Sequence, residues 1–231
     1  MQHKAIVGVL ILNTNFPRLP GDIGNPVTFR YPVKYITVQS ATPANITVAT
    51  ELPESLQSDF CDAARQLMDL EVSVITTSCG FLTPMQEQLA KLSTVPVICS
   101  ALSLMPLLAT VHGGSEYLGV LTFNRDTLNQ NHIRDVIPGA IEGLRADDSL
   151  RSVISRDLPD IDREQAQTEV LAAATRLLNQ KPAIRAIVLE CTNLSPYKNA
   201  IRQSTGLPVY DVVDAVHWLI ESQPHQPDSQ P

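Results

Sequence analysis

Cysteine is scarce in this sequence, with four residues in 231, and the four are widely separated: Cys61, Cys79, Cys99 and Cys191. No two of them form a CxxC motif, and none lies beside a histidine at the spacing of zinc ligands. A disulfide framework needs more cysteines in a shorter chain. We therefore expect free thiols and no metal site.

Positive charge and long apolar runs are scarce as well. The 17 Lys and Arg residues are outnumbered by 24 Asp and Glu residues, which gives a net charge of −7, and neither sign forms a long run. This balance argues against a nucleic-acid or anionic-membrane partner. The first apolar run, residues 5–12, is too short to span a membrane and lacks a signal-peptide cleavage site. We expect a cytoplasmic protein.

Short apolar runs alternate with stretches of helical periodicity, which is typical of an α/β fold in which mainly parallel sheets are flanked by helices. The predicted strands are residues 4–12, 35–39, 72–77, 95–99, 117–123, 183–190 and 207–210. The predicted helices are residues 53–70, 84–92, 102–111, 125–136, 162–179, 196–204 and 212–222. Residues 13–32, rich in Pro, Gly and Asn, are predicted to form a long binding loop.

An internal repeat divides the chain into two halves. The same residue types follow a cysteine at identical distances in each half: Leu82, Pro84, Pro96 and Val97 after Cys79, and Leu194, Pro196, Pro208 and Val209 after Cys191. Gly-Val-Leu at residues 8–10 returns at residues 119–121. Self-similarity at a fixed offset indicates a duplicated unit. We predict two lobes related by a pseudo-twofold axis, residues 1–98 plus 211–231 and residues 99–210, with the active site in the cleft between them.

Cys79 and Cys191 are the candidate catalytic residues. Each follows a predicted strand and precedes a predicted helix, where open α/β sheets bind ligands. The N–H groups and dipole of a helix N-terminus favour a thiolate, so we expect the pKa of each thiol to lie below its usual value of about 8.5. Two opposed thiols can remove a proton from one face of an α-carbon and return one to the other face. Such a racemisation needs no cofactor.

Small polar residues near the two cysteines are the candidate substrate-binding residues. Their N–H groups and side chains suit a carboxylate and the enediolate that forms when the α-proton leaves. The candidates beside the cysteines are Ser78, Gly80, Thr192 and Asn193. Asn13 and Asn124 end the first strand of each half, and they either contact the substrate or cap the turn that follows.

Three further residues with reactive side chains are assigned to structure rather than to chemistry. Cys61 lies in a helical stretch with apolar neighbours, and Cys99 has Asp211 at its equivalent position in the repeat. Glu190 precedes Cys191, so strand alternation predicts that it points away from the thiol. We expect Glu190 to form a structural salt bridge.

The segments TTSCGF at residues 76–81 and LECTN at residues 189–193 resemble the aspartate/glutamate/hydantoin racemase superfamily. The resemblance implies two Rossmann-like lobes with pseudo-twofold symmetry, one cysteine from each lobe, no cofactor and often a homodimer. Cys79 and Cys191 match the paired cysteines of that superfamily, and Thr192 matches the threonine after the second one. Asn13 and Asn124 match the polar residues that end the first strand of each lobe.

Two departures from the superfamily bear on the substrate. Glutamate racemases carry Asp-Ser-Gly after the first strand, where this chain has Leu-Asn-Thr-Asn at residues 12–15. They also carry Gly-Cys-Thr-His, where this chain has Glu-Cys-Thr-Asn at residues 190–193. Glutamate is therefore not the expected substrate. Members with a single cysteine resemble arylmalonate decarboxylases, so two intact cysteines favour racemisation.

The sequence thus predicts a cofactor-independent racemase or epimerase of a small α-amino acid or a related carboxylate. Two other classes of function stay open. In the first, Cys79 is the nucleophile of a cis–trans isomerase, or one cysteine serves a decarboxylase, and the substrate is a small dicarboxylate. In the second, the chain is a ligand-binding homologue that keeps the cleft without catalysis.

Overall fold

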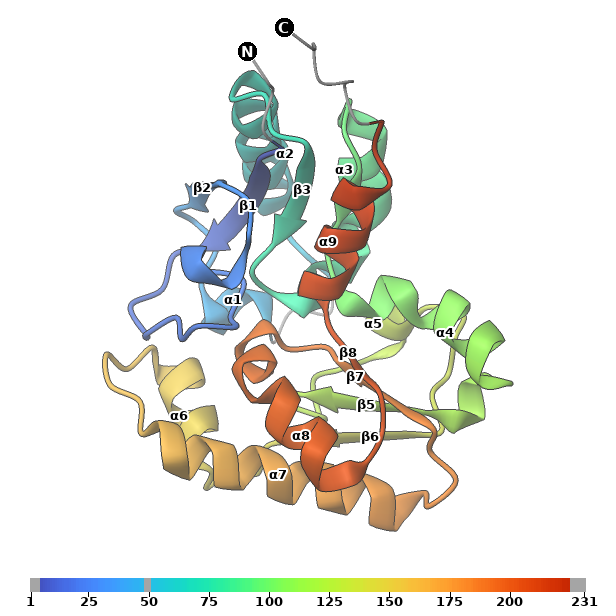
Figure 1. The fold of residues 1–231 in the computed structure, drawn as a ribbon. Coiled ribbons are helices and arrows are strands. Elements are labelled where there is room, and N and C mark those ends of the chain that lie inside the picture. Colours follow the sequence, from blue (N-terminus) through green and yellow to red (C-terminus); the bar gives the residue numbers. More distant parts are fainter. Residues whose placement is uncertain (1–4, 48–50, 225–231) are drawn as a thin grey trace, which may run out of the picture.

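The structure, a computed structural model, describes residues 5–47 and 51–224. Its strands form two four-stranded parallel sheets with the same strand order (Figure 1). The first sheet has the order β2-β1-β3-β4, with β1 Val7–Leu12, β2 Val33–Val38, β3 Val74–Thr77 and β4 Val97–Ile98. The second has the order β6-β5-β7-β8, with β5 Leu118–Thr122, β6 Ala140–Gly143, β7 Ala186–Leu189 and β8 Val209–Tyr210.

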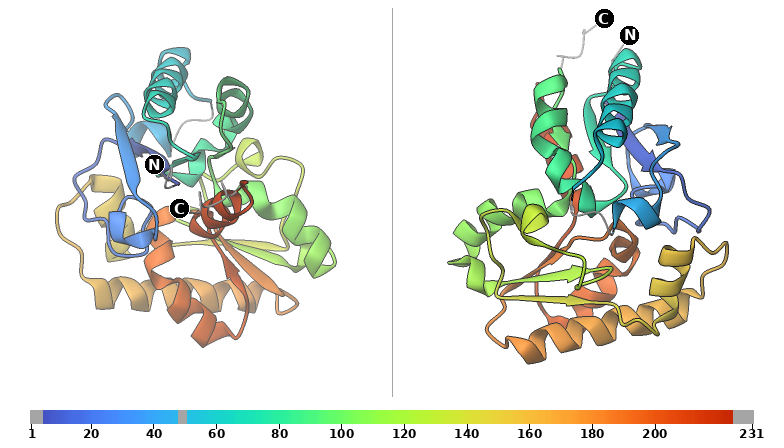
Figure 2. Two further views of the ribbon diagram at one scale, coloured as in Figure 1. Left: turned by 45° about the horizontal axis from the view of Figure 1, so that its top comes forward. Right: turned by 180° about the vertical axis from the view of Figure 1, so that it is seen from behind.

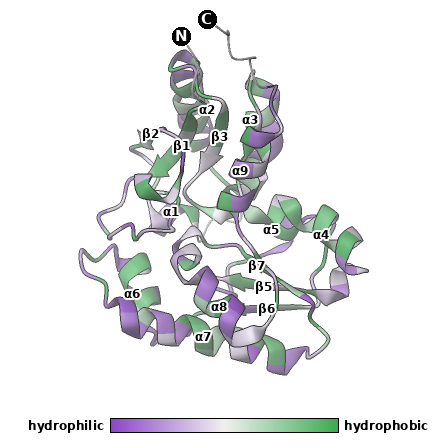
Figure 3. Cartoon of the chain, viewed as in Figure 1, coloured by the Kyte–Doolittle hydropathy of each residue, from purple (hydrophilic) through white to green (hydrophobic). Residues whose placement is uncertain are grey.

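Helices surround both sheets. The α-helices are α1 Pro43–Ile46, α2 Glu54–Asp69, α3 Gln86–Leu92, α4 Met105–His112, α5 Gln130–Ile133, α6 Ser149–Arg156, α7 Arg163–Gln180, α8 Lys198–Thr205 and α9 Val212–Glu221. The 3₁₀ helices are η1 Pro26–Thr28, η2 Gly80–Met85, η3 Ala101–Leu104, η4 Ser115–Tyr117 and η5 Thr192–Tyr197. Along α6, α7 and α8 hydrophilic and hydrophobic residues alternate, as in helices that pack one side on a sheet (Figure 3). The expected α/β class is confirmed.

The repeat seen in the sequence has a packing reason at its two glycines. A Cβ atom on Gly8 of β1 would lie 3.2 Å from Leu67 of α2, and one on Gly119 of β5 would lie 2.7 Å from Leu177 of α7. Each glycine therefore lets the first long helix of its half approach the central strand closely. The same close contact accounts for the glycine that begins Gly-Val-Leu in both halves.

Both faces of the second sheet are buried. Along β7, Ala186 and Val188 belong to one apolar core, whereas Ile187 and Leu189 belong to another. The first core also contains the interior of the first sheet, so it continues from one half of the molecule into the other. On the outer side, α7 runs along the second sheet (Figure 2). Two buried faces explain why the strands are nearly continuous apolar runs.

The last helix of each half lies on the other half. The segment after β4, formed by η3 and α4, packs on β7 and β5 of the second sheet. The helix after β8, α9, packs on β3 and β4 of the first sheet (Figure 1). The two halves therefore exchange a covering helix. The lobe boundaries at residues 98/99 and 210/211 stay a prediction that agrees with this exchange.

Besides the four-residue helix α1, which was not predicted, three segments differ from the sequence-based prediction. β6 was missed because its four residues, Ala-Ile-Glu-Gly, carry no apolar run. A second omission is α6, whose eight residues begin after Asp148 and end at Asp157, a left-handed residue with φ 53°. In place of a helix over residues 125–136, only α5 forms. The chain first makes a turn after Asn124, and Arg134 then ends α5 with φ 55°.

None of the helices within residues 5–47 and 51–224 combines the length and apolar character needed to cross a lipid bilayer.

The packing of Gly119 gives a first prediction. Gly119→Ala should lower the free energy of unfolding by about 1–3 kcal/mol, because the new methyl group would overpack against Leu177. Urea denaturation measures this change. Gly119→Ala combined with Leu177→Ala should cost less than the sum of the single variants, since the second substitution removes the clashing carbons. A Gly119→Ala variant with the wild-type midpoint would contradict the packing argument.

Candidate active site

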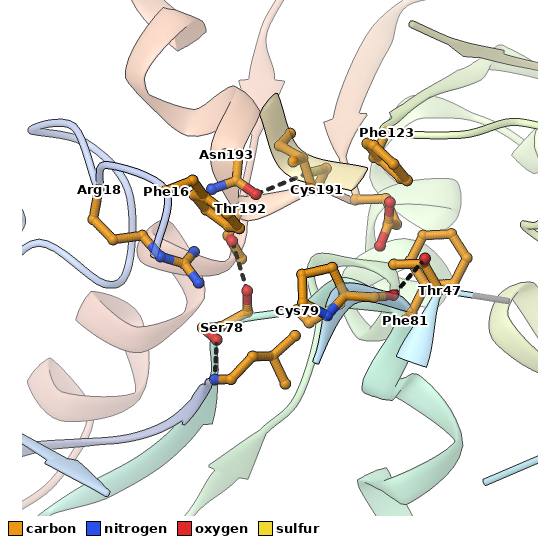
Figure 4. A pocket seen from close by; sticks show the side chains of 15 residues that line it. Phe16, Arg18, Thr47, Ser78, Cys79, Phe81, Phe123, Cys191, Thr192 and Asn193 are labelled. Atoms are coloured by element: carbon orange, nitrogen blue, oxygen red, sulfur yellow. Dashed lines mark hydrogen bonds between the residues drawn. The ribbon is translucent and has the colours of Figure 1, made fainter. Parts of the chain in front are cut away.

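A cavity lies between the two halves, where the central strands of both sheets end, and it encloses about 360 Å³ of empty space that is partly open to solvent (Figure 4). Most of its wall comes from segments that follow β1, β3, β5 and β7. The lining residues are Leu12, Phe16, Arg18, Pro43, Thr47, Ser78, Cys79, Gly80, Phe81, Phe123, Ile154, Glu190, Cys191, Thr192 and Asn193. The cavity therefore occupies the position at which parallel α/β sheets bind ligands.

The cavity brings together Cys79 and Cys191, one from each half (Figure 4). Cys79 precedes η2 and is partly exposed, whereas Cys191 precedes η5 and is buried. The two residues occupy equivalent positions in equivalent strand-to-helix turns. This is the arrangement that a reaction at a small carbon acid between two thiols requires.

The thiol pKa values run opposite to the sequence-based expectation. Burial raises the pKa of Cys79 to about 12 and raises that of Cys191 well above its usual value, and the Glu190 carboxylate adds to both effects. One backbone N–H opposes the shift at each thiol, from Phe81 and Asn193 respectively. The helices that follow are short 3₁₀ turns, so a single N–H does not offset burial. Both cysteines are protonated at neutral pH.

Glu190 also departs from its predicted role. Its carboxyl group is buried and lines the cavity beside both cysteines, rather than pointing away in a salt bridge. One oxygen, Oε2, accepts a hydrogen bond from Thr122 Oγ1 at 2.6 Å, while Oε1 has no hydrogen-bond partner. Burial raises the pKa of Glu190 to about 7. The prediction failed because β7 ends at Leu189, so strand alternation no longer applies at residue 190.

Gly80 lies directly against Glu190. A Cβ atom at residue 80 would collide with the Glu190 carbonyl oxygen and with its carboxyl group. The glycine therefore permits the turns after β3 and β7 to touch. This close contact is its structural role, beside the substrate contact that the sequence predicts.

Ser78 and Thr192 connect the two halves beneath the cavity. The Thr192 hydroxyl donates to the Ser78 carbonyl oxygen at 2.9 Å, and the Ser78 hydroxyl accepts from the Leu12 N–H at 3.0 Å (Figure 4). Both side chains are almost completely buried. Their hydroxyls thus hold the strand ends in place as well as lining the cavity.

Asn193 connects the second cysteine to the long loop. Its Oδ1 accepts a hydrogen bond from the Cys191 thiol at 3.7 Å, and its Nδ2 donates to Asp22 Oδ2 at 2.7 Å. The amide therefore stabilises the protonated form of Cys191 and fixes the loop over the cavity.

Asn13 and Asn124 lie outside the set of residues that line the cavity. Asn13 is exposed, and its Nδ2 donates to the Gln39 carbonyl oxygen at 3.2 Å. Asn124 caps its own turn, where its Oδ1 accepts from the Asp126 N–H at 3.1 Å. Of the two roles left open by the sequence, the geometry favours turn formation for both residues.

Arg18 is the charged cavity-lining residue that sequence reasoning missed. It reaches the cavity from the loop of residues 13–32, with 11% of its side chain exposed, and its guanidinium lies 4.4 Å over the Phe16 ring. The group pairs with Asp22 at 3.3 Å, but its Nε is buried without a hydrogen-bond partner. The sequence marked this loop as a binding loop, yet nothing there separates Arg18 from Arg30.

The loop that carries Arg18 is held to the second half by Asp157. This residue ends α6, and its carboxylate accepts hydrogen bonds from the Asn15 N–H, the Asn15 amide and the Phe16 N–H at 2.7, 2.7 and 3.1 Å. Together with the Asp22 contact to Asn193, these bonds fasten the loop across the gap between the halves. Arg18 is thereby fixed toward the cavity.

The family model described as Asp/Glu/Hydantoin racemase matches residues 31–220. A dimethylsulfoniopropionate lyase of Durusdinium sp. clade D is 30% identical, and the match covers 94% of this chain and 74% of that protein. Dimethylsulfoniopropionate lyase 7 of Emiliania huxleyi (strain CCMP1516) is 29% identical, with 93% of this chain and 66% of that protein covered.

Solved structures share the fold at low identity. Arylmalonate decarboxylase superposes with a TM-score of 0.63 at 14% identity and covers 96% of each chain. Allantoin racemase from Klebsiella pneumoniae gives a TM-score of 0.65 at 16% identity, covering 94% of this chain and 86% of that one. Glutamate racemase from Francisella tularensis subsp. tularensis SCHU S4 gives 0.56 at 16% identity, covering 98% and 85%. These likenesses confirm the two-lobe architecture.

The expected amino-acid racemase function is wrong. Relatives that match 94% of the chain are named as lyases of dimethylsulfoniopropionate, not as racemases of amino acids. The error has a chemical reason, because removal of a proton next to a carboxylate is a step that racemases share with eliminating lyases. Two cysteines and a carboxylate site do not reveal whether the substrate carries a leaving group.

The raised thiol pKa values give a second prediction. The alkylation rate of Cys79 by iodoacetamide should keep rising above pH 10, whereas a thiol with a pKa of about 8.5 reaches its plateau earlier. Glu190→Gln should move the inflection to lower pH, because it removes a like charge beside the thiol. Mass spectrometry of the Cys79 peptide measures the rate. The exposed Glu87→Gln serves as the matched control, and an unchanged profile in Glu190→Gln would contradict the assignment.

Proposed function

Because the chain belongs to the Asp/Glu/Hydantoin racemase family, matched over residues 31–220, we propose that this enzyme is a lyase whose substrate is dimethylsulfoniopropionate. The observation that carries the proposal is the similarity, over 94% of the chain, to proteins named dimethylsulfoniopropionate lyases. A cavity with two thiols and a buried arginine supports it. The compound has a carboxylate at one end and a dimethylsulfonium cation on the carbon β to it.

The proposed reaction is an elimination. A thiolate takes one proton from the carbon next to the carboxylate, the remaining electron pair forms a carbon–carbon double bond, and the bond from the β-carbon to sulfur breaks. The products are acrylate, dimethyl sulfide and one proton, which the thiol returns to water. The first half of this sequence equals the first half of a racemisation. The elimination differs from a racemisation only in that the substrate carries a leaving group on the neighbouring carbon.

Arg18 is the proposed carboxylate-binding residue. Arg18 is the one positively charged residue among the described residues that line the cavity. Its buried Nε has no hydrogen-bond partner in the part of the chain that the structure describes. Negative charge moves into the carboxylate as the α-proton leaves, so a fixed cation there stabilises the transition state more than the ground state. The Asp22 contact orients the guanidinium and leaves the Nε edge available.

Cys79 is the proposed base. It is the more exposed of the two thiols, and the positive charge of Arg18 lowers the pKa of Cys79 against the effect of burial. Asn193 Oδ1 also accepts the Cys191 thiol proton, which favours the neutral form of that residue. A sulfonium cation that enters the cavity favours a nearby thiolate and lowers its pKa. Substrate binding would therefore ionise the base, and Cys191 would hold a proton on the opposite face of the α-carbon.

The third prediction tests the proposed activity. The wild-type protein should convert dimethylsulfoniopropionate into dimethyl sulfide and acrylate, measured by gas chromatography of the headspace and by proton NMR. Cys79→Ala should lower kcat by about 10²- to 10⁴-fold, the usual contribution of a general base. Cys61→Ala, in α2 and away from the cavity, is the matched control and should keep kcat within about twofold. A wild-type protein that releases no dimethyl sulfide would overturn the proposal.

The fourth prediction concerns Arg18. Arg18→Gln should raise KM by about tenfold to a hundredfold, and Arg18→Lys by less, because lysine keeps the charge but loses the planar fork. Arg30→Gln, in the same loop but exposed, should leave KM unchanged. The carboxamide analogue of the substrate provides a second readout: wild type should discriminate against it, and Arg18→Gln should not. Equal discrimination in both proteins would exclude Arg18 as the carboxylate partner.

A further inference from the structure

Glu190 is a buried acid without a compensating cation. Its carboxyl group is 1% exposed, only Oε2 has a side-chain donor, and Oε1 has none. The other charged residue of the cavity, Arg18, pairs with Asp22 and not with Glu190. An ionised carboxylate in such a place is costly unless a positive charge comes near it. A nearby cation would stabilise the ionised Glu190, and the described part of the chain does not supply one.

Glu190 lies at the opposite side of the cavity from Arg18. The Phe123 backbone N–H approaches the Glu190 carboxylate, and Gly80, which precedes Phe81, lies against it. Figure 4 places Phe123 and Phe81 on one side of the cavity and Arg18 on the other, with the two cysteines between them. The cavity thus has an anionic end and a cationic end.

We propose that the Glu190 carboxylate and the Phe81 ring form a subsite for the onium cation of a zwitterionic substrate whose carboxylate lies at Arg18. This inference rests on the proposed lyase function and adds the residues that recognise the leaving group. The α-carbon of a zwitterion held at both ends lies between the charges, which is where the two cysteines are. Aromatic rings attract cations by their negative faces, and the apolar wall strengthens the charge pair by excluding water.

After burial, the Glu190 carboxylate is the next largest cause of the high thiol pKa values. The Glu190 carboxylate raises the pKa of both cysteines, which opposes formation of a thiolate base while the cavity is empty. A bound onium cation neutralises that carboxylate and removes its effect on the thiols. Glu190 thereby makes thiolate formation depend on a cationic ligand. A neutral or purely anionic carboxylate would leave both thiols protonated.

The charge of Glu190 sets an expected pH dependence. Burial raises its pKa to about 7, so it carries its negative charge above that pH and loses it as the pH falls. The titratable groups that line the cavity beside it are the Cys79 and Cys191 thiols, whose raised pKa values keep both protonated across this range. Affinity for an onium ligand should therefore fall as the pH drops through about 7. Affinity for a ligand of the same shape that lacks the onium charge should not change with the ionisation of Glu190.

Two inert probes isolate the cation from the rest of the ligand. The first, 3-(trimethylammonio)propanoate, has the onium charge, and the second, 4,4-dimethylpentanoate, has the same shape and carboxylate without it. Isothermal titration calorimetry at pH 6 and pH 8.5 gives the ratio of their dissociation constants. At pH 8.5 the wild type should bind the onium probe at least about tenfold more tightly than the probe without the onium charge, and this preference should be smaller at pH 6.

Two Glu190 variants and one control complete the experiment. Glu190→Gln keeps an oxygen for the Thr122 hydroxyl but loses the charge, so its ratio should lie within about twofold of one at both pH values. Glu190→Asp keeps the charge and should retain a preference for the onium probe. The exposed Glu87→Gln should behave as wild type. Circular dichroism checks that each variant is folded. If Glu190→Gln does not fold, the probe ratio of Glu190→Asp is compared with that of the wild type instead.

The outcomes separate this inference from the proposed function. An unchanged ratio in Glu190→Gln, or a wild-type protein that does not prefer the onium probe, overturns the subsite. A wild type that prefers the onium probe but releases no dimethyl sulfide from dimethylsulfoniopropionate overturns the lyase and leaves the subsite standing. Loss of kcat in Glu190→Gln with an unchanged probe ratio would assign the residue to proton transfer, which also contradicts the proposal.

Discussion

The contact between the turn after β3 and the turn after β7 fixes the geometry of this molecule. Thr192 donates to the Ser78 carbonyl oxygen, and Gly80 leaves no room for a side chain against Glu190. Because each turn belongs to a different half of the chain, this single contact joins the two sheets at their carboxyl ends. It also brings the two cysteines, which precede equivalent 3₁₀ helices, to one cavity. A looser junction would admit water and separate the thiols.

Burial at that junction controls the chemistry as much as the choice of residues does. Two thiols and one carboxyl group share a small space, and each disfavours the ionisation of the others. Near pH 7 both thiols are protonated, so among the described lining residues the empty cavity carries charge only at Glu190 and Arg18. Charge on the incoming ligand then decides which groups ionise. The specificity of such a site lies in electrostatics more than in shape.

The sequence predicted the duplication, the parallel sheets and the position of both cysteines, because strand-length apolar runs and a fixed offset are local signals. It did not predict Arg18, since a loop gives no periodicity from which direction can be inferred. Glu190 was assigned to the wrong side because alternation was extended one residue beyond the end of β7. The reaction class was also out of reach, because racemases and eliminating lyases begin with the same proton transfer. The two reaction classes differ in whether the substrate carries a leaving group, and no residue type in the sequence indicates this.

The exchange of covering helices has a consequence for synthesis. The first sheet is complete in sequence once β4 has been made, but the helix that covers its inner region, α9, is translated only after all strands of the second sheet. The apolar residues of α9, such as Val212, Val216 and Ile220, can be buried against the first sheet only after β5 to β8 have been translated. Domains that fold during synthesis usually do so from the N-terminus onward. Here the apolar surface of the first sheet stays uncovered until α9, which follows the second sheet in the chain, has been translated.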